Sequence, residues 1–383
     1  MPEIWLQYGK TDIALDIRFE NLYKEIIPTF TPLQEDQFSS KLQDVPLSEN
    51  SLVIVLSSSK ATKQVLSSLV DTATGKGVNE ITIVTLPKLK GFIDIQNDNN
   101  YSSSLLSASD LVSLTGTIAK FEKTVFLSHS AYDPLFGFEG TPTHVLRNFM
   151  DDKMSEAFSL RTNDLPSPGI ISEPYRLALS VCKDIEAMSI EIVGNSNSIS
   201  DIYCGSIEES FTKSSSKLIE NSGVEEHRVK SAIISPGSDL LYHTTLTQSL
   251  NCLWNSVHIL SDHGTAILLG ESSGGLGSKA LEMFVEGRTD VSLLRENGKY
   301  VEGQEHVMFL EAMREKYDFG IISTLPEYYL KTKLGLKTFD SLKQVLTNLL
   351  LRYGKNHKVS VLSDARYTSP RSGIGIDNEL KHP

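Results

Sequence analysis

Continuous apolar runs alternate with stretches of helical periodicity along the chain, and this pattern predicts an alternating strand–helix order. Residues 52–56 (LVIVL) and 80–86 (EITIVTL) are runs typical of strands buried on both faces of a sheet. Residues 60–74 between them carry apolar side chains at helical spacing, and Gly75 and Gly77 end that predicted helix. A strand, a helix and a strand within about 35 residues form a βαβ unit, which predicts a parallel sheet.

The rest of the first half follows the same logic. Alternating polar and apolar residues over 3–20 predict a β-hairpin that turns at Gly9–Asp12, and the polar residues 92–104 predict a surface loop. The other predicted elements are a short helix and the strand KTVFL within 105–127, a Gly/Pro loop and a helix within 128–150, a helix over 173–183, a strand over 187–193, a turn at 195–200 and a helix over 206–222.

A second α/β series begins near Val229. It comprises predicted strands over 231–237, 318–324 and 358–362 and predicted helices over 243–258, 303–316 and 339–353. We therefore predict an α/β fold of two three-layer αβα domains, with mostly parallel sheets and a cleft between them. The expected limits are 1–228 for the first domain, 229–365 for the second and 366–383 for a loose Ser/Arg/Gly/Pro-rich tail.

The stretch 262–285 predicts a strand, a glycine-rich loop and a helix in direct succession. Such a layout places backbone N–H groups at a helix start, where an anion can bind. Its segment GLGSKA (275–280) fits one form of the dinucleotide fingerprint, but no acidic residue ends a following strand, and a tight turn with positive φ is the alternative. The candidate binding residues in this loop are Ser272, Ser273, Gly274, Gly275, Gly277 and Ser278.

Composition argues against nucleic-acid and membrane partners. The 383 residues include 36 Lys or Arg against 48 Asp or Glu, a net charge of −12 that argues against a nucleic-acid partner. No apolar run reaches the ~18 residues of a membrane span. The absence of a signal-peptide core and three widely spaced cysteines favour the cytoplasm. The histidines show no H-x-x-x-H or H-E-x-x-H spacing, so we predict no protein-held metal site.

Candidate catalytic residues follow predicted strands, at the edge where parallel sheets bind ligands. His129 and Asp133 follow one buried strand and could act as acid and base, although loop capping is the alternative. Lys90 follows another strand and either holds a carboxylate or is solvated. His144, early in the next helix, faces either the cleft or solvent.

Three consecutive serines, Ser57, Ser58 and Ser59, follow the strand LVIVL. Their hydroxyl and N–H groups could cradle an anion at the start of the next helix. N-capping of that helix by one serine uses the same geometry, so the sequence leaves both interpretations open.

Several segments together resemble one known family. HGTAILLGESSGGLGS (263–278) is similar to its GGTIILVAECSEGIGS stretch, GFEGTPTHVL (137–146) resembles its GFSGG-x-K loop, and VKSAIISPGSDL (229–240) resembles its strand with a Pro-Gly-Gly turn. LVIVLSSSKATKQVL (52–66) and ITIVTLPKLKG (81–91) occupy the places of its D-x-T-R-P and G-T-H-R motifs. Over roughly residues 50–362 the chain resembles the nickel-dependent lactate racemase family.

The resemblance implies two α/β domains that racemise or epimerise 2-hydroxy acids by hydride transfer to a lysine-tethered nickel-pincer nucleotide, with histidines as acid and base. Here Thr143 stands in place of the tethering lysine, and Asp133, Lys90 and Ser58 stand in place of other motif residues. We thus expect a divergent relative that binds a small anion, a hydroxy acid, in its cleft, with a diverged or lost activity and an unknown cofactor. The expected catalytic residues are Lys90, His129 and Asp133, and the expected cofactor-binding residues also include Ser57, Ser58, Ser59, Gly137, Gly140 and Thr143.

Two alternatives remain at this point. The chain could be a non-catalytic ligand-binding or regulatory protein on the same fold. A dinucleotide-dependent enzyme is a third hypothesis, and it depends on GLGSKA alone.

Overall fold

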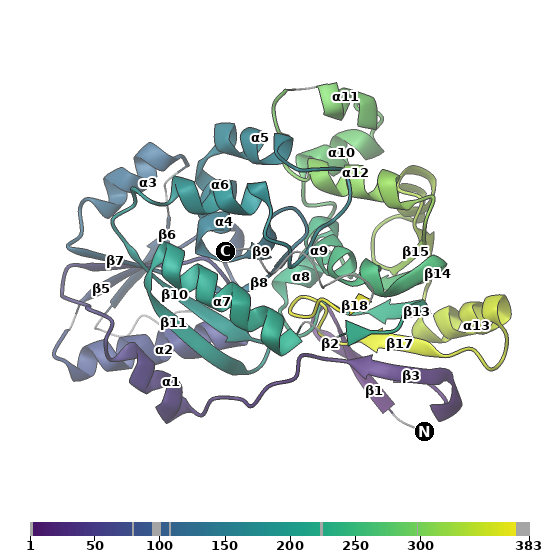
Figure 1. The fold of residues 1–383 in the computed structure, drawn as a ribbon, viewed down its shortest axis with the longest axis horizontal. Coiled ribbons are helices and arrows are strands. Elements are labelled where there is room, and N and C mark those ends of the chain that lie inside the picture. Colours follow the sequence, from purple (N-terminus) through teal and green to yellow (C-terminus); the bar gives the residue numbers. More distant parts are fainter. Residues whose placement is uncertain are drawn as a thin grey trace.

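A computed structural model describes residues 3–78, 80–93, 101–106, 109–222, 225–296 and 298–372. Two six-stranded sheets lie side by side, each flanked by helices (Figure 1). The predicted α/β class with mostly parallel sheets is confirmed. No helix in the described part of the chain is long and apolar enough to cross a membrane.

The first sheet has the strand order β11-β10-β7-β4-β5-β6 and is parallel except for β11. Its strands are β4 (Ser51–Val55), β5 (Ile81–Thr85), β6 (Tyr101–Leu105), β7 (Lys123–His129), β10 (Met188–Gly194) and β11 (Ile199–Ser206). One face packs against α1 (Glu35–Leu42) and α2 (Lys60–Gly75). The other packs against α3 (Leu111–Ile118), α4 (Thr141–Phe149), α6 (Glu173–Val181) and α7 (Ile207–Ser222).

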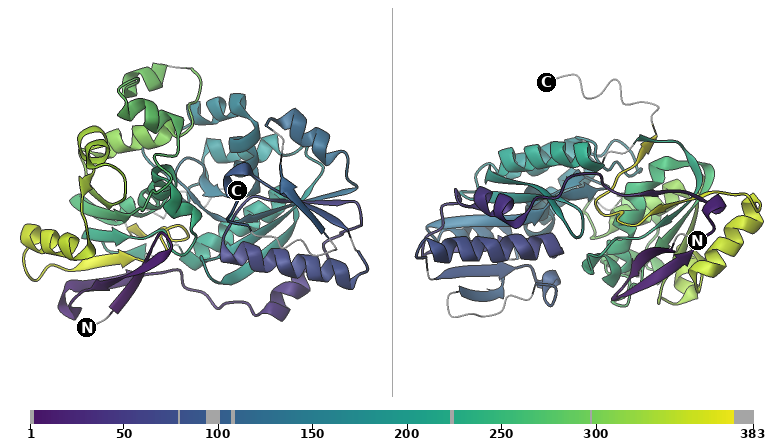
Figure 2. Two further views of the ribbon diagram at one scale, coloured as in Figure 1. Left: turned by 180° about the vertical axis from the view of Figure 1, so that it is seen from behind. Right: turned by 90° about the horizontal axis from the view of Figure 1, so that it is seen from below.

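The second sheet has the order β16-β15-β14-β13-β17-β3 and is parallel throughout. Its strands are β3 (Leu22–Ile26), β13 (Val229–Ile234), β14 (Leu260–Leu269), β15 (Asp318–Ile322), β16 (Lys337–Thr338) and β17 (Val359–Leu362). The hairpin of β1 (Glu3–Tyr8) and β2 (Thr11–Asp16) and helix α13 (Leu342–Tyr353) cover one face (Figure 2). The other face packs against α8 (Leu241–Thr244), α9 (Leu246–Ser256), α10 (Lys279–Val285) and α12 (Gln304–Met313).

The remaining elements join these layers. They are the short hairpin of β8 (Ala131–Asp133) and β9 (Gly137–Glu139), helices α5 (Asp151–Ser159) and α11 (Val291–Glu296), the 3₁₀ turns η1 (Phe19–Asn21), η2 (Pro87–Leu89) and η3 (Val257–Ile259), the π-helical turn η4 (Tyr328–Lys333), and the two-residue pair of β12 (Glu225–Glu226) and β18 (Arg371–Ser372).

Several sequence predictions need correction. The expected loop over 92–104 contains strand β6, whose polar sequence YSSSL hides an edge strand, and residues 94–100 lie outside the described part. Strand β11 was not predicted, and β3 joins the second sheet although it lies near the start of the chain. The tail is also not loose at its start, because Arg366 and Tyr367 are only 1% and 2% exposed. The domain boundary at 228 stays a prediction.

Candidate functional site

A cavity of about 640 Å³ opens where the carboxyl ends of strands from both sheets meet. Strand ends β4, β5 and β7 contribute from the first sheet, and the segment after β13 contributes from the second. This is the position at which parallel α/β sheets bind ligands. Its wall is rich in polar side chains: Ser57, Ser58, Lys88, His129, Asp133, Glu139, His144, Arg147, Asp239, Tyr242, Tyr300, Glu305, His306 and Tyr367.

The three serines after β4 have different positions: one caps α2 and two line the cavity. Ser59 is the N-cap of α2, and its Oγ accepts a hydrogen bond from the Thr62 N–H at 3.1 Å. Ser57 and Ser58 line the cavity, and Ser58 Oγ donates to Asp239 Oδ1 at 3.2 Å across the two halves of the molecule. N-capping therefore falls to Ser59, and Ser57 and Ser58 stay candidates for ligand binding.

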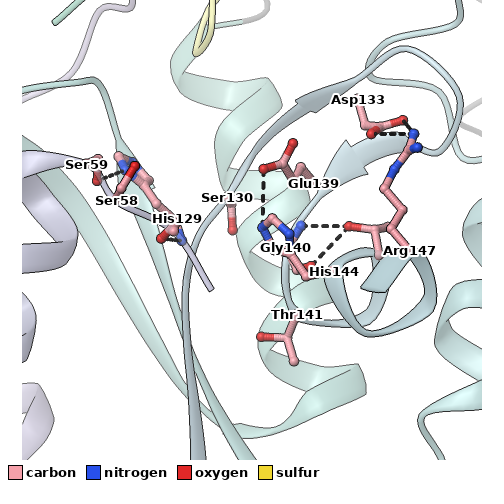
Figure 3. Close-up of polar contacts among 12 residues, drawn as sticks. Ser58, Ser59, His129, Ser130, Asp133, Glu139, Gly140, Thr141, His144 and Arg147 are labelled. Atoms are coloured by element: carbon pink, nitrogen blue, oxygen red, sulfur yellow. Dashed lines mark hydrogen bonds and ion pairs between the residues drawn. The ribbon is translucent and has the colours of Figure 1, made fainter. Parts of the chain in front are cut away.

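His129, the last residue of β7, forms part of the cavity wall and is 1% exposed. Its ring stacks on Tyr367 at a centroid distance of 4.3 Å, and its Nδ1 lies 2.7 Å from Ser59 Oγ (Figure 3). The Nε2 atom is buried and has no hydrogen-bond partner among the described residues. Burial, and secondarily the charge of Arg366, lowers the pKa of His129 to about 3. The imidazole is therefore neutral at physiological pH, with Nε2 left to bind a ligand.

A buried ion-pair cluster forms behind this wall around Glu139. Arg366 forms an ion pair with Glu139 Oε2, and its guanidinium lies 4.3 Å from the centre of the Tyr242 ring. His144 Nε2 lies 3.2 Å from Glu139 Oε1, and the Tyr242 hydroxyl donates to the same oxygen at 3.0 Å. Burial would raise the pKa of Glu139, but Arg366 and His144 outweigh it and hold that pKa well below its usual value.

The carboxylate of Asp133 is held by backbone N–H groups and by Arg147. Its Oδ1 accepts hydrogen bonds from the N–H groups of Leu135 and Phe136 at 2.8 and 2.7 Å. Arg147 binds both of its oxygens at 3.2 and 3.0 Å (Figure 3). Arg147 also pairs with Glu305 at 2.8 Å. With its oxygens committed in this way, Asp133 lines the cavity as a paired carboxylate.

Lys88, rather than the predicted Lys90, faces the cavity. The turn η2 begins at Pro87, and it places Lys88 in the cavity wall and Lys90 outside it, although both side chains are exposed. The protein surrounding the cavity lowers the pKa of Lys88 by desolvation, and Glu139 partly opposes this shift. Within the described part of the chain, no side chain forms a hydrogen bond or ion pair with Lys88.

The glycine loop 272–278 does not line the cavity. The N–H groups of Ser272 and Gly274 donate to the carbonyl oxygens of His243 and Thr244, at 2.8 and 2.7 Å. Gly277 has φ +82°, and a Cβ there would lie 2.3 Å from Thr245 Cβ. The loop is therefore the tight turn of the alternative interpretation, packed onto the start of α9. The same packing removes Ser273, Gly275 and Ser278 from the cavity wall.

Thr143, Gly137 and Gly140 are also absent from the wall. The Thr143 side chain is fully buried, and its hydroxyl accepts from the Gly140 N–H and donates to the Gly140 carbonyl, both at 3.0 Å. Gly137 has φ +84° and lies against the Ile170 backbone. These residues shape the start of α4 rather than bind a ligand.

The residues at the place of the racemase cofactor do not fit a tethered nickel-pincer nucleotide. The tether requires an amine, and Thr143 offers a hydroxyl whose hydrogen bonds are already made. In the described part of the chain, no group of three or more His, Cys, Asp or Glu side chains is arranged to hold a metal ion.

The sequence interpretation missed most of the cavity wall. Lys88, Glu139, Arg147, Asp239, Tyr242, Tyr300, Glu305, His306 and Tyr367 were not selected, and His144 was left undecided. The signal available for Glu139 was its place in the GFEG turn beside His129 and Asp133. Lys88 stood two residues from the chosen Lys90, and Tyr367 lay in the presumed tail.

Comparison with known proteins supports the fold. No family model and no curated protein matches the sequence. The fold is similar to that of the lactate racemase apoprotein from Thermoanaerobacterium thermosaccharolyticum, with a TM-score of 0.72, 14% sequence identity and coverage of 97% of this chain and 100% of that one. It is also similar to a protein from Thermotoga maritima, with a TM-score of 0.67, 10% identity and coverage of 89% and 99%. The resemblance seen in the sequence is thus confirmed as a lactate-racemase-like scaffold.

Proposed function

We propose that the chain binds a small anionic molecule, a hydroxy acid, in the cavity between its two sheets. The observation that carries this proposal is that Lys88 lines the same cavity as Ser57 and Ser58, which precede α2. A carboxylate there would gain a charge-assisted hydrogen bond and the favourable end of the helix dipole. The similarity to the lactate racemase apoprotein supports the same class of ligand.

The charges of the wall favour this role for Lys88. The carboxylates of Asp133 and Glu305 are paired with Arg147, and Glu139 is paired with Arg366. Asp239 accepts hydrogen bonds from Ser58 and from the Tyr367 hydroxyl, the latter at 3.4 Å. The pairing of these acids inside the protein lowers their competition with a ligand for the Lys88 ammonium group. Asp151, Asp152 and Glu302 also line the cavity, and no cation among the described residues pairs with them.

The cavity also bounds the size of the ligand. Pockets of about 300–1,000 Å³ enclose molecules of drug size. The volume of about 640 Å³ is therefore generous for a three-carbon acid and accommodates longer hydroxy acids. His129, neutral and with a free Nε2, can hydrogen-bond a hydroxyl group of such a ligand.

Activity is a separate part of the proposal. With Thr143 in place of a tethering lysine, we infer that the chain has a diverged activity or none, and that it does not use the tethered pincer. A cofactor-independent isomerase is the second candidate, because His129 is neutral and lines the cavity. A non-catalytic binding or regulatory protein is the alternative.

Binding is tested by calorimetry and thermal shift with lactate, malate and gluconate on the wild type, K88M and K90M. We expect K88M to weaken hydroxy-acid binding by tenfold or more, because it loses a charge-assisted hydrogen bond of about 1.5–3 kcal/mol. The matched variant K90M should bind as the wild type does, because Lys90 lies outside the cavity wall. The absence of any response in the wild type at millimolar ligand would contradict the proposal.

Activity is tested by chiral chromatography of D- and L-hydroxy acids and by metal analysis of the purified protein. Stoichiometric nickel together with turnover would overturn the inference that the pincer chemistry is absent. Turnover without metal would favour the second candidate.

A further inference from the structure

A chain of three hydroxyl groups connects two residues of the cavity wall. His129 Nδ1 lies 2.7 Å from Ser59 Oγ, which lies 2.9 Å from Thr62 Oγ1, which in turn lies 2.8 Å from Ser57 Oγ. This row of hydrogen-bonded groups begins and ends at the cavity, because both His129 and Ser57 line the cavity. Thr62 and Ser59 are fully buried between them.

Counting hydrogen-bond donors and acceptors leaves two possible directions for the hydrogen bonds that link His129, Ser59, Thr62 and Ser57. Each hydroxyl has one proton and two lone pairs. Ser59 Oγ already accepts from the Thr62 N–H, and Ser57 Oγ already accepts from the His129 N–H at 2.9 Å. Within the described part of the chain, the Thr62 hydroxyl has only Ser57 and Ser59 as hydroxyl partners. Each of the three contacts, Nδ1–Ser59, Ser59–Thr62 and Thr62–Ser57, therefore holds one proton only if all three hydroxyls donate in the same direction.

The two directions give His129 opposite roles. When Ser57 donates to Thr62, Thr62 to Ser59 and Ser59 to Nδ1, the imidazole proton sits on Nε2 and Ser57 Oγ offers a lone pair to the cavity. When Nδ1 donates to Ser59 and the chain runs the other way, Nε2 offers a lone pair and Ser57 offers its proton. The ring stays neutral in both arrangements, which agrees with the low pKa of His129.

We propose that His129, Ser59, Thr62 and Ser57 form a reversible proton relay that presents one hydrogen-bond donor and one acceptor to the ligand and can exchange them. In the exchange, a ligand proton passes to His129 Nε2, the Nδ1 proton passes to Ser59, that of Ser59 to Thr62, that of Thr62 to Ser57, and that of Ser57 to the ligand. No charge is created and no further reactant is consumed.

The relay would determine which ligands fit. A hydroxy acid brings one hydroxyl donor and carboxylate acceptors, so it matches either direction of the chain. A keto acid brings acceptors alone, and the relay supplies a single donor to it in either direction. This specificity rests on the proposed hydroxy-acid binding, whereas the relay itself is a property of the ligand-free protein.

The relay is tested first without a ligand, by ¹⁵N chemical shifts of the His129 ring. The H129Q variant identifies its signals among those of the nine histidines. In T62V, a proton on Nδ1 would leave the Ser59 hydroxyl without an acceptor, so we expect the shifts to move to those of the Nε2–H tautomer. S57A should do the same, because the Thr62 hydroxyl can then donate only to Ser59.

Two variants serve as controls for this measurement. T62S keeps the hydroxyl and should keep the wild-type shifts. T85V removes a buried hydroxyl outside the relay, one that donates to the Val55 carbonyl at 3.2 Å, and should also leave them unchanged. Wild-type shifts in both T62V and S57A would overturn the relay.

The second measurement compares the dissociation constants of lactate and pyruvate. T62V frees the Ser57 hydroxyl while His129 keeps its Nε2 proton, so both can donate to pyruvate at once. We expect the preference for lactate over pyruvate to fall by about tenfold from wild type to T62V, the value of one hydrogen bond. An unchanged preference would overturn the assigned specificity. If the wild type binds neither acid, the proposed function fails while the tautomer result still stands.

Discussion

The strand ends of the first sheet and the glycine loop of the second occupy the same kind of position, after a buried strand and before a helix. At the first sheet, Ser57, Ser58 and His129 face a cavity, and His129 Nε2 has no partner. In the glycine loop, the N–H groups of Ser272 and Gly274 donate to carbonyl oxygens of α8. Since buried backbone groups must be paired, a loop that satisfies itself has little left for a ligand.

The difference shows what distinguishes a ligand site from a turn of similar composition. Glycine allows the backbone to turn, but a site also needs polar groups whose hydrogen bonds are incomplete. The first sheet keeps such groups because its strand ends meet the second half of the molecule across a cavity. The following predictions test this contrast, beginning with the largest effect.

The buried charges of the cavity side give the largest expected effect. R366M removes the cation that pairs with Glu139 and leaves a buried carboxylate without it, so we expect a loss of about 3–5 kcal/mol in the free energy of unfolding. Urea denaturation measures it. R352M, which breaks the exposed pair of Arg352 and Asp318, is the control and should cost less than about 1 kcal/mol. Equal losses in the two variants would contradict the role given to Arg366.

Substitutions in the glycine loop give the next largest effect, and we expect them to change the free energy of unfolding but not ligand affinity. G277A places a Cβ 2.3 Å from Thr245 Cβ in a left-handed backbone, so we expect a loss of about 3 kcal/mol. G275A has a similar φ of +93° with open space around it and should lose only about 1 kcal/mol. Hydroxy-acid affinity, measured on the folded fraction, should stay at the wild-type value in both. Weaker binding by G275A would place the loop in the site.

The contrast also explains which parts of the fold the sequence predicts. Strands β4, β5 and β13 are apolar runs of a kind that only a sheet buried on both faces requires, so local pattern identified them. Edge strand β6 has the polar sequence YSSSL, and β3 pairs with β17 more than 300 residues away in the chain. Neither strand can be recognised from the local sequence pattern, because its place in a sheet depends on a partner strand elsewhere in the chain.

The site was harder to predict than the fold for a related reason. Whether a lysine enters a cavity depends on one turn of backbone, as Lys88 and Lys90 show. Whether a glycine loop has free N–H groups depends on what packs against it, here Thr244 and Thr245. Arg366 and Tyr367 belong to the site because of the chain path after β17, and their polar neighbours suggested a tail.

A pH-dependent effect of up to about 3 kcal/mol is expected beneath α4. Glu191 accepts a hydrogen bond from the Thr141 N–H at 2.9 Å, and burial raises its pKa to about 7. The folded protein therefore holds this proton more tightly than the unfolded chain, and its stability should fall as the pH rises from about 4.5 to 7. In the E191Q variant this fall should be smaller by the Glu191 contribution, as followed by urea denaturation across that range.

Two comparisons isolate the Glu191 contribution. Asp364, whose pKa burial also raises to about 7, is present in the wild type and in E191Q, so the difference between their curves removes it. E208Q changes an exposed glutamate on α7 and should keep the wild-type curve. A fall in E191Q as large as that of the wild type would assign the proton to another group.

The smallest expected effect falls on the glycine loop itself. The Ser273 side chain is exposed, and its Oγ makes one long contact of 3.4 Å, to Glu271 Oε2. We expect S273A to change the free energy of unfolding by less than about 0.5 kcal/mol, as surface substitutions generally do. Calorimetry should give the wild-type affinity for hydroxy acids, because Ser273 lies outside the cavity wall. Since S273A should disturb so little, a loss of affinity in this variant would be direct evidence that the loop contacts the ligand, and the distinction between the two strand ends would then be wrong.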